Sequence, residues 1–192
     1  MNRVDRSELL PLGTYEQIRE RFRQRVIALK RRRRLELGAH MSLVFENHDT
    51  VLHQIQEMLR AERISDERAI AHEVETYNEL IPNEGELSAT LFIEYEQAEE
   101  RSRMLRSFAS LRDAVRLRVG ERTVTARFAT HFGEELDRLP AVNYLRFAPG
   151  KQIAAELRNP DFAARIEIAH ADYPQLLDLP RELRHELAND LD

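Results

Sequence analysis

The chain has 192 residues, a formal net charge of −5 at pH 7, 42% hydrophobic residues and 33% charged residues. This composition is typical of a folded globular protein, and the length suffices for one large domain or two small ones. The sequence contains no cysteine, which excludes disulfides, thiolate metal ligands, iron–sulfur ligation and thiol nucleophiles. No apolar run approaches the ~20 residues of a membrane-spanning helix, and the amino terminus has no apolar leader. We therefore expect a cytoplasmic protein without a membrane segment.

Positive charge is concentrated near the amino terminus. Residues 1–40 carry eleven Lys or Arg and five Asp or Glu, whereas residues 41–192 carry eighteen and twenty-nine. Residues 30–34 are five consecutive cations, KRRRR. At the carboxyl end of a helix, such cations meet the partial negative charge of the backbone carbonyls. A nucleic-acid site would also need stacking aromatic residues or a recognised module, and neither is evident. We expect a helix end or a docking site for a protein partner, and no nucleic-acid binding.

An apolar repeat indicates that a helix precedes and includes this run. The residues that recur at helical spacing are Ile18, Phe22, Val26 and Leu29, which predict a helix over about 15–34. Thr14 and Gln17 have the spacing of a capping box at its start. Gly38 is suited to a left-handed cap beyond its end.

Strands and helices alternate along the rest of the chain. We predict strands at 41–46, 88–95, 115–119, 122–129, 142–147 and 164–171, and helices at about 50–63, 66–81, 97–113, 151–158 and from Pro180 onward. Ser65 is predicted to cap the helix at 66–81. This order indicates an α+β fold, in which amino-terminal helices precede an antiparallel or mixed sheet with helices packed on one face. We expect a single domain over 1–192, with a helical part at about 1–82 and a mixed strand–helix part at about 88–192.

The helix predicted at 50–63 has two contrasting faces. Val51, Leu52, Ile55, Met58 and Leu59 project onto an apolar face, and Glu62 projects onto its centre. A buried, unpaired carboxylate is costly, so Glu62 should lie at the helix end or meet a cation, a buried donor or a metal. Arg25 or an arginine of 30–34 is a reasonable partner. We therefore expect Glu62→Gln to destabilise the protein more than Glu57→Gln.

The opposite face of this helix carries His53, Glu57 and Arg60. Two interpretations are open for these residues. One is a solvated face with a weak His–Glu pair, and the other is a polar site covered by another element.

Several segments together resemble the recurring blocks of a bacterial family of unknown function, domain-of-unknown-function family 3501. The blocks are RVIALKRRRR, FENHDT, QIQEMLRAERI, YNELIP and YLRF, and the resemblance extends from about residue 10 to the carboxyl terminus. It implies a small cytoplasmic protein, and it implies proximity to redox modules that contain rubrerythrin and iron–sulfur proteins. The positions that it carries over are Arg25, Lys30, Arg33, Glu46, Asn47, Gln54, Gln56, Glu57, Arg60, Glu62, Asn78, Pro82 and Arg146.

These residues define the candidate site. The candidate polar site consists of Glu46, Gln56, Glu57, Arg60 and Glu62, with Arg25, Lys30 and Arg33 as possible ion-pair partners. No metal or cofactor is expected, because HExxH, GxGxxG, GxxxxGK[ST] and GxSxG motifs are all absent. A weaker alternative is a carboxylate–imidazole metal site that includes His48 and His53, with Glu46 and Glu57.

Two functional hypotheses follow from this pattern. The first is an accessory or binding protein that works beside a protein partner, such as a redox module containing rubrerythrin or iron–sulfur proteins. The second is a small enzyme, or a sensor of a metal or anion, with a polar site of carboxylate, arginine and histidine. The oligomeric state, the substrate and the partner's identity stay open.

Overall fold

The computed structural model describes residues 1–129 and 137–191. The α-helices are α1 (Leu12–Arg33), α2 (His48–Ala61), α3 (Glu67–Asn78), α4 (Ala98–Ser107), α5 (Gly150–Arg158) and α6 (Arg181–Asp190). The strands are β1 (Arg34–Glu36), β2 (Met41–Phe45), β3 (Leu87–Ile93), β4 (Val115–Val119), β5 (Arg122–Thr125), β6 (Arg127–Phe128), β7 (Val142–Phe147), β8 (Ala164–Ile168) and β9 (Gln175–Asp178). Short 3₁₀ helices, η1 (Arg6–Glu8) and η2 (Phe108–Asp113), complete these elements. None of the helices in these residues has both the length and the apolar character needed to cross a membrane.

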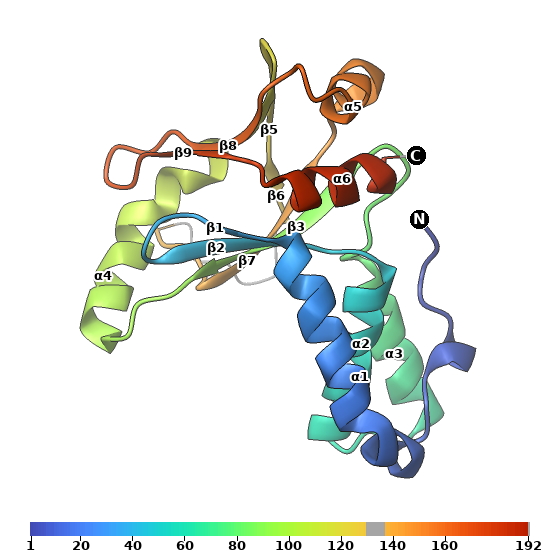
Figure 1. Ribbon diagram of the computed structural model, residues 1–192. Helices are drawn as coiled ribbons and strands as arrows, with labels where there is room; N and C mark the ends of the chain where they lie inside the picture. Colours follow the sequence, from blue (N-terminus) through green and yellow to red (C-terminus); the bar gives the residue numbers. More distant parts are fainter. Residues whose placement is uncertain (130–136, 192) are drawn as a thin grey trace.

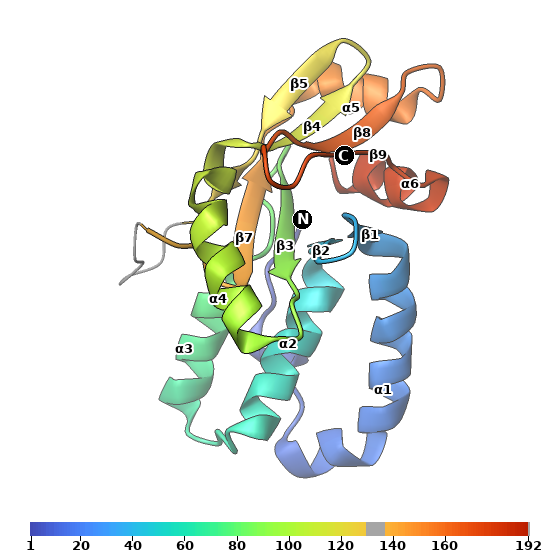
Figure 2. The ribbon, with the colours of Figure 1, turned by 90° about the vertical axis from the view of Figure 1, so that its left-hand side faces the viewer.

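The strands form two antiparallel sheets. The first sheet has the order β1-β2-β3-β7-β6, and the second has the order β5-β4-β8-β9. Helices α1, α2 and α3 lie on one side of the first sheet, while the second sheet, α5 and α6 lie on the other (Figures 1 and 2). The α+β class is confirmed, with an amino-terminal helix before the sheet.

The second sheet was not predicted, and the segment 122–129 explains how it arises. Residues 122–125 pair with β4, whereas residues 127 and 128 pair with β7 of the first sheet. Between them, the buried Ala126 donates its N–H to the Val115 carbonyl at 2.8 Å. A segment predicted as one strand therefore passes from one sheet to the other.

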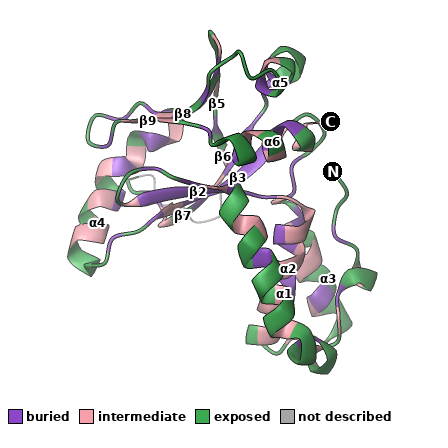
Figure 3. Cartoon of the chain, viewed as in Figure 1, coloured by how far each residue is buried: buried purple, intermediate pink, exposed green. Residues whose placement is uncertain are grey.

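The main hydrophobic core lies between the two sheets. It combines Phe45, Leu91 and Leu145 of the first sheet with Leu117 and Ile166 of the second. Helices α2 and α3 instead pack against each other and the amino-terminal segment, through a separate cluster of Val4, Leu9, Val51, Ile55, Leu59, Ile70 and Ile81. Helix α1 is exposed over most of its length (Figure 3). The helical side of the first sheet therefore lacks the continuous apolar packing of its other side.

The ends of two helices differ from their predicted positions. Helix α1 begins at Leu12 after Pro11, so Thr14 lies inside the helix and the predicted capping box is wrong. Proline suits this position because its ring fixes the backbone without removing a needed donor. Helix α3 is capped by Asp66, not Ser65, since the Asp66 carboxylate accepts the N–H groups of Arg68 and Ala69.

Helix α1 also ends without a glycine cap. It ends at Arg33, and the chain continues directly into β1. Gly38 is left-handed, with φ of 78°, but it forms the turn between β1 and β2. The Tyr173 hydroxyl holds this turn, since it donates to the Leu37 carbonyl at 2.6 Å and accepts the His40 N–H at 2.9 Å.

The close packing of this turn predicts an unequal response of two glycines to alanine. A Cβ at Gly38 would lie 2.7 Å from the Tyr173 hydroxyl oxygen, whereas a Cβ at Gly85, also left-handed, would meet nothing within 4 Å. We expect Gly38→Ala to lower the free energy of unfolding by about 2 kcal/mol and Gly85→Ala by about 1 kcal/mol. Urea unfolding of both variants measures the difference, and equal losses would contradict a tightly packed turn.

Candidate functional site

The helical side of the first sheet carries polar side chains. Along β3, Leu91 and Ile93 point to the main core, so Ser88, Thr90 and Phe92 point to the opposite side. The antiparallel register sets Thr90 opposite Tyr144 and Phe92 opposite Val142 of β7. Residues that face each other on one side of two strands have neighbouring side chains. This side of the sheet therefore presents a hydroxyl, a phenol and apolar groups to the helices.

A cavity of about 290 Å³ lies between this side of the sheet and helices α1 and α2. Its lining residues are Lys30, Glu46, Val51, Gln54, Leu80, Thr90, Phe92, Val142 and Tyr144. We call this space the Glu46 cavity. Its walls combine apolar and polar side chains, and two residues of opposite charge, Glu46 and Lys30, contribute to them.

Glu46 is a buried carboxylate held by neutral donors. Only 7% of the residue is exposed, and the Thr50 and Thr90 hydroxyls donate to its two oxygens at 2.5 and 2.6 Å. Glu46 precedes Asn47, the N-cap residue of α2, and a reciprocal cap between Asn47 and Thr50 closes the first turn of this helix. The amino end of a helix stabilises a nearby negative charge. Within residues 1–129 and 137–191, no cation forms an ion pair with the Glu46 carboxylate.

Lys30, from α1, is the positively charged residue among those that line the cavity. It makes no hydrogen bond or ion pair with any other residue that the structure describes. The pKa of His53 is lowered, mainly by burial and then by the nearby Lys30 charge. On the sheet side, burial raises the pKa of Tyr144, with further contributions from Tyr77 and the Glu46 carboxylate. The cavity therefore joins an anion and a cation that do not neutralise each other by direct contact.

Glu57 and Arg60 belong to a different cluster, between α1 and α2. The Glu57 carboxylate accepts from the Tyr15 hydroxyl at 2.6 Å and from two guanidinium nitrogens of Arg19 at 2.9 and 2.8 Å. Arg60 approaches the same carboxylate at 3.5 Å and Glu16 at 3.7 Å. The Arg19 hydrogen bonds, aided by Tyr15, lower the pKa of Glu57 from 4.5 to about 2. Glu57 thus connects two helices, and of the two interpretations of this face the structure shows the one in which another element, α1, covers it.

The other two members of the predicted polar site lie elsewhere. Gln56 is buried and holds the amino-terminal segment, because its side chain accepts the Leu10 N–H at 2.9 Å and donates to the Leu10 carbonyl at 3.1 Å. Glu62 is exposed and directly follows the last residue of α2. Of the alternatives predicted for Glu62, the structure shows the helix end. The five predicted residues therefore do not share one pocket, and only Glu46 lines the Glu46 cavity.

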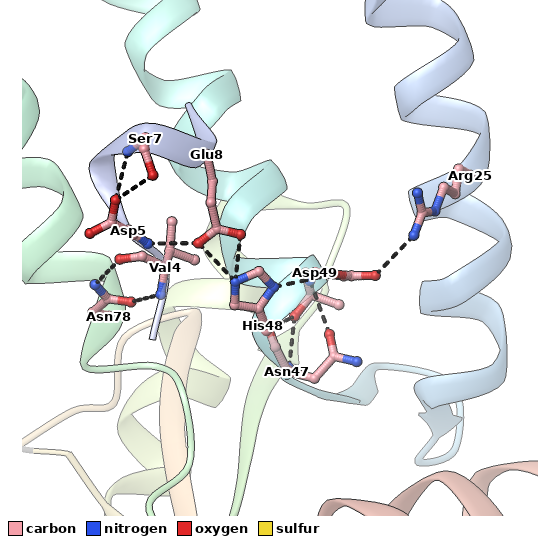
Figure 4. A network of polar contacts seen from close by, with 10 residues as sticks. Val4, Asp5, Ser7, Glu8, Arg25, Asn47, His48, Asp49 and Asn78 are labelled. Carbon is pink, nitrogen blue, oxygen red and sulfur yellow. Dashed lines mark hydrogen bonds and ion pairs between the residues drawn. The ribbon is translucent and has the colours of Figure 1, made fainter. Parts of the chain in front are cut away.

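The three predicted ion-pair partners have separate roles. Arg25 pairs with Asp49 at 3.4 Å on the surface (Figure 4). Arg33 is fully buried and forms ion pairs with Glu186, at 3.0 Å, and with Asp190 of α6. Neither arginine pairs with Glu62, so that predicted partnership is wrong. Lys30 lines the cavity.

The two histidines of the alternative metal site point to different neighbours. His48 lies between Glu8, at 3.1 Å, and Asp49, at 3.3 Å (Figure 4). His53 instead stacks on Phe22 of α1, with ring centroids 5.8 Å apart. The predicted set of two histidines with Glu46 and Glu57 therefore does not converge. In the described part of the chain, no group of three or more His, Asp or Glu residues has a geometry that would hold a metal ion.

A hydrogen bond between a serine and a histidine beside the second sheet runs in the wrong direction for nucleophilic catalysis. The Ser110 hydroxyl lies 3.0 Å from Nε2 of the buried His170. Nδ1 of His170 accepts the backbone N–H of Asp172 at 3.2 Å, so Nδ1 is unprotonated. The neutral ring then carries its proton on Nε2 and donates it to Ser110. His170 therefore orients a loop and does not act as a base toward Ser110.

Four polar residues that line the Glu46 cavity or donate to the Glu46 carboxylate were not predicted as site residues. They are Thr50, Gln54, Thr90 and Tyr144. Alternation in the strand 88–95 carries a signal for Thr90, because a threonine opposite Leu91 faces away from the main core. No local pattern places Tyr144 beside Thr90, since that pairing joins strands 54 positions apart in the chain.

Comparison with known proteins supports the fold and leaves the chemistry open. A family model described as "Protein of unknown function (DUF3501)" matches residues 3–191. The crystal structure of a novel protein of unknown function from Burkholderia pseudomallei K96243 is similar, with a TM-score of 0.92 and 35% sequence identity over 100% of both chains. The search of curated proteins returns no match for this chain.

Proposed function

Because the chain belongs to the DUF3501 family of proteins of unknown function, we propose its function from the Glu46 cavity: an accessory protein that binds a small molecule there. A cytoplasmic location and a protein partner, as expected from the sequence, are part of this proposal. The redox neighbourhood implied by the family resemblance suits an accessory role. The chain has no cysteine with which to ligate an iron–sulfur cluster of its own.

One observation carries the proposal: the carboxylate of Glu46 is buried in a cavity without a cationic partner among the described residues. Burying a charged group is costly unless hydrogen bonds and an opposite charge compensate. Two threonine hydroxyls supply hydrogen bonds but no positive charge. A ligand that donates hydrogen bonds to Glu46 would complete this environment, and Lys30 offers a second charged contact.

The alternative function, an enzyme or sensor centred on Glu57 and Arg60, has weaker support. Glu57 accepts hydrogen bonds from Tyr15 and from two nitrogens of Arg19. Its low pKa, about 2, makes it a weak base at neutral pH. A structural role between α1 and α2 accounts for these contacts.

Selective chemistry at lysine tests the proposal, because the chain has only two lysines, Lys30 and Lys151. Lys30 lines the cavity, whereas Lys151 is exposed on α5 and serves as an internal control. We expect a protein-free metabolite extract of bacterial cells to slow acetylation of Lys30 and to leave Lys151 unchanged, as measured by peptide mass spectrometry.

The variant Glu46→Gln should abolish this protection, because it removes the negative charge from the cavity. Circular dichroism checks that the variant is folded. Equal acetylation rates of Lys30 with and without extract would contradict a small-molecule site. Protection of Lys30 that persists in a folded Glu46→Gln protein would show that Glu46 is not part of the ligand site.

A further inference from the structure

The Glu46 cavity brings together two opposite charges and an apolar surface, and we propose that its ligand is a small aliphatic amino acid. This inference rests on the proposed function and specifies its ligand class. The ammonium group would donate to Glu46, the carboxylate would accept from Lys30, and the aliphatic side chain would contact the apolar wall.

The first step concerns the amino group. The Glu46 oxygens each accept one hydroxyl proton, from Thr50 and Thr90. A carboxylate oxygen has two lone pairs, so each oxygen retains one acceptor site. A primary ammonium has three donors and a full positive charge, which meets both unfilled requirements of Glu46. A neutral donor would satisfy the lone pairs but would place no positive charge beside the buried carboxylate.

The second step concerns the acid group. Lys30 lines the same cavity and makes no hydrogen bond or ion pair with another described residue. A simple cation at Glu46 would lie in the field of the Lys30 ammonium, and like charges in one small cavity repel. An anionic group on the same ligand removes this repulsion. A zwitterion is therefore favoured over an amine alone, which the Lys30 ammonium would repel. It is also favoured over an acid alone, which the Glu46 carboxylate would repel.

The third step concerns size and the apolar wall. The volume of about 290 Å³ is at the lower end of ligand pockets, which measure about 300–1,000 Å³. The apolar lining comes from Val51, Leu80, Phe92 and Val142. This wall suits a branched aliphatic side chain better than a polar one. A neighbouring cavity of about 420 Å³ shares Leu80 and Tyr144, which leaves space beyond these two residues.

Three compounds with one carbon skeleton test the ligand class. L-leucine carries both charges, 3-methylbutylamine lacks the carboxylate, and 4-methylpentanoate lacks the amino group. We expect isothermal titration calorimetry to show that leucine binds at least about tenfold tighter than either analogue, since each analogue loses a charge-assisted contact.

The variants assign each charge to its residue. Lys30→Met should remove the preference for leucine over the amine, and Glu46→Gln should remove the preference for leucine over the acid. Lys151→Met is the matched control and should bind all three compounds as the parent does. Thermal unfolding of each variant checks that it is folded.

The outcomes separate this inference from the proposed function. If metabolite extract protects Lys30 but leucine binds no tighter than its analogues, the cavity binds a small molecule and the amino-acid class is wrong. If the extract does not slow acetylation of Lys30 and calorimetry shows no binding of leucine, both proposals fail. A leucine preference that persists in folded Lys30→Met and Glu46→Gln proteins would place the site elsewhere and would also overturn this inference.

Discussion

Replacing Arg33 with methionine is expected to lower the free energy of unfolding by about 3–5 kcal/mol. The Arg33 side chain is fully buried, and its guanidinium donates to the Phe45 carbonyl at 2.9 Å and to Glu186 at 3.0 Å. It also donates to Asp190, whose side chain is only 9% exposed. Removing the arginine leaves two carboxylates of α6 without their buried cation, and an uncompensated buried charge is strongly destabilising.

Arg32 provides a matched control for this substitution. It also approaches Glu186, at 3.6 Å, but its side chain is 53% exposed. Exposed ion pairs contribute little, so Arg32→Met should cost less than about 1 kcal/mol. Denaturant unfolding of both variants at neutral pH measures the contrast. Losses of similar size in the two variants would show that burial does not set the role of Arg33.

A second large effect is expected at Glu57, with a distinctive dependence on pH. Glu57→Gln should lower the free energy of unfolding by about 3 kcal/mol at pH 7, in line with a pKa lowered from 4.5 to about 2. A carboxylate with a lowered pKa stabilises the folded state above its unfolded pKa. This contribution is lost as the pH falls from about 4.5 to about 2, where Glu57 becomes protonated. The stability difference between parent and variant should therefore diminish over this range.

Glu62→Gln is the control for this prediction, since it makes the same chemical change in an exposed residue beyond the end of α2. This order of effects reverses the one expected from the sequence, because Glu62 is exposed and Glu57 is hydrogen-bonded to α1. The effect of Glu62→Gln should stay within about 0.5 kcal/mol at all pH values. Urea unfolding between pH 2 and pH 7 provides the measurement. A Glu57→Gln loss as small as that of Glu62→Gln would mean that the Arg19 and Tyr15 contacts contribute little to stability.

Local patterns predicted most helices and strands, but not the pairing of strands into two sheets. The spacing of Val51, Ile55 and Leu59 predicts an amphipathic helix, and these three residues are buried in α2. By contrast, β9 has Leu176 exposed at 52% and buries no residue fully, so alternation is too weak to reveal it. The split of segment 122–129 between sheets depends on partners distant in sequence, β4 and β7, which no local window contains.

The candidate site shows the same limit. Projection at 100° per residue placed Glu62 on the apolar face, but α2 ends at Ala61, so the projection does not apply to Glu62. The sequence left a solvated Glu57 and a covered Glu57 both open, because its partner, Arg19, lies on another helix, 38 positions away. Glu46 was identified as a site residue through the family resemblance, whereas its cavity depends on strand register and helix packing.

The contact between Arg33 and α6 has a consequence for synthesis of the protein in the cell. Glu186 lies 153 positions after Arg33. On a translating ribosome, α1 therefore emerges long before the carboxylates that neutralise Arg33. During this interval the basic run at 30–34 has no acidic partner from α6, so the nascent chain presents its cations to other anions in the surroundings. Native docking of the carboxyl end of α1 must wait for an element of distant sequence, which favours slow, late completion of this part of the fold.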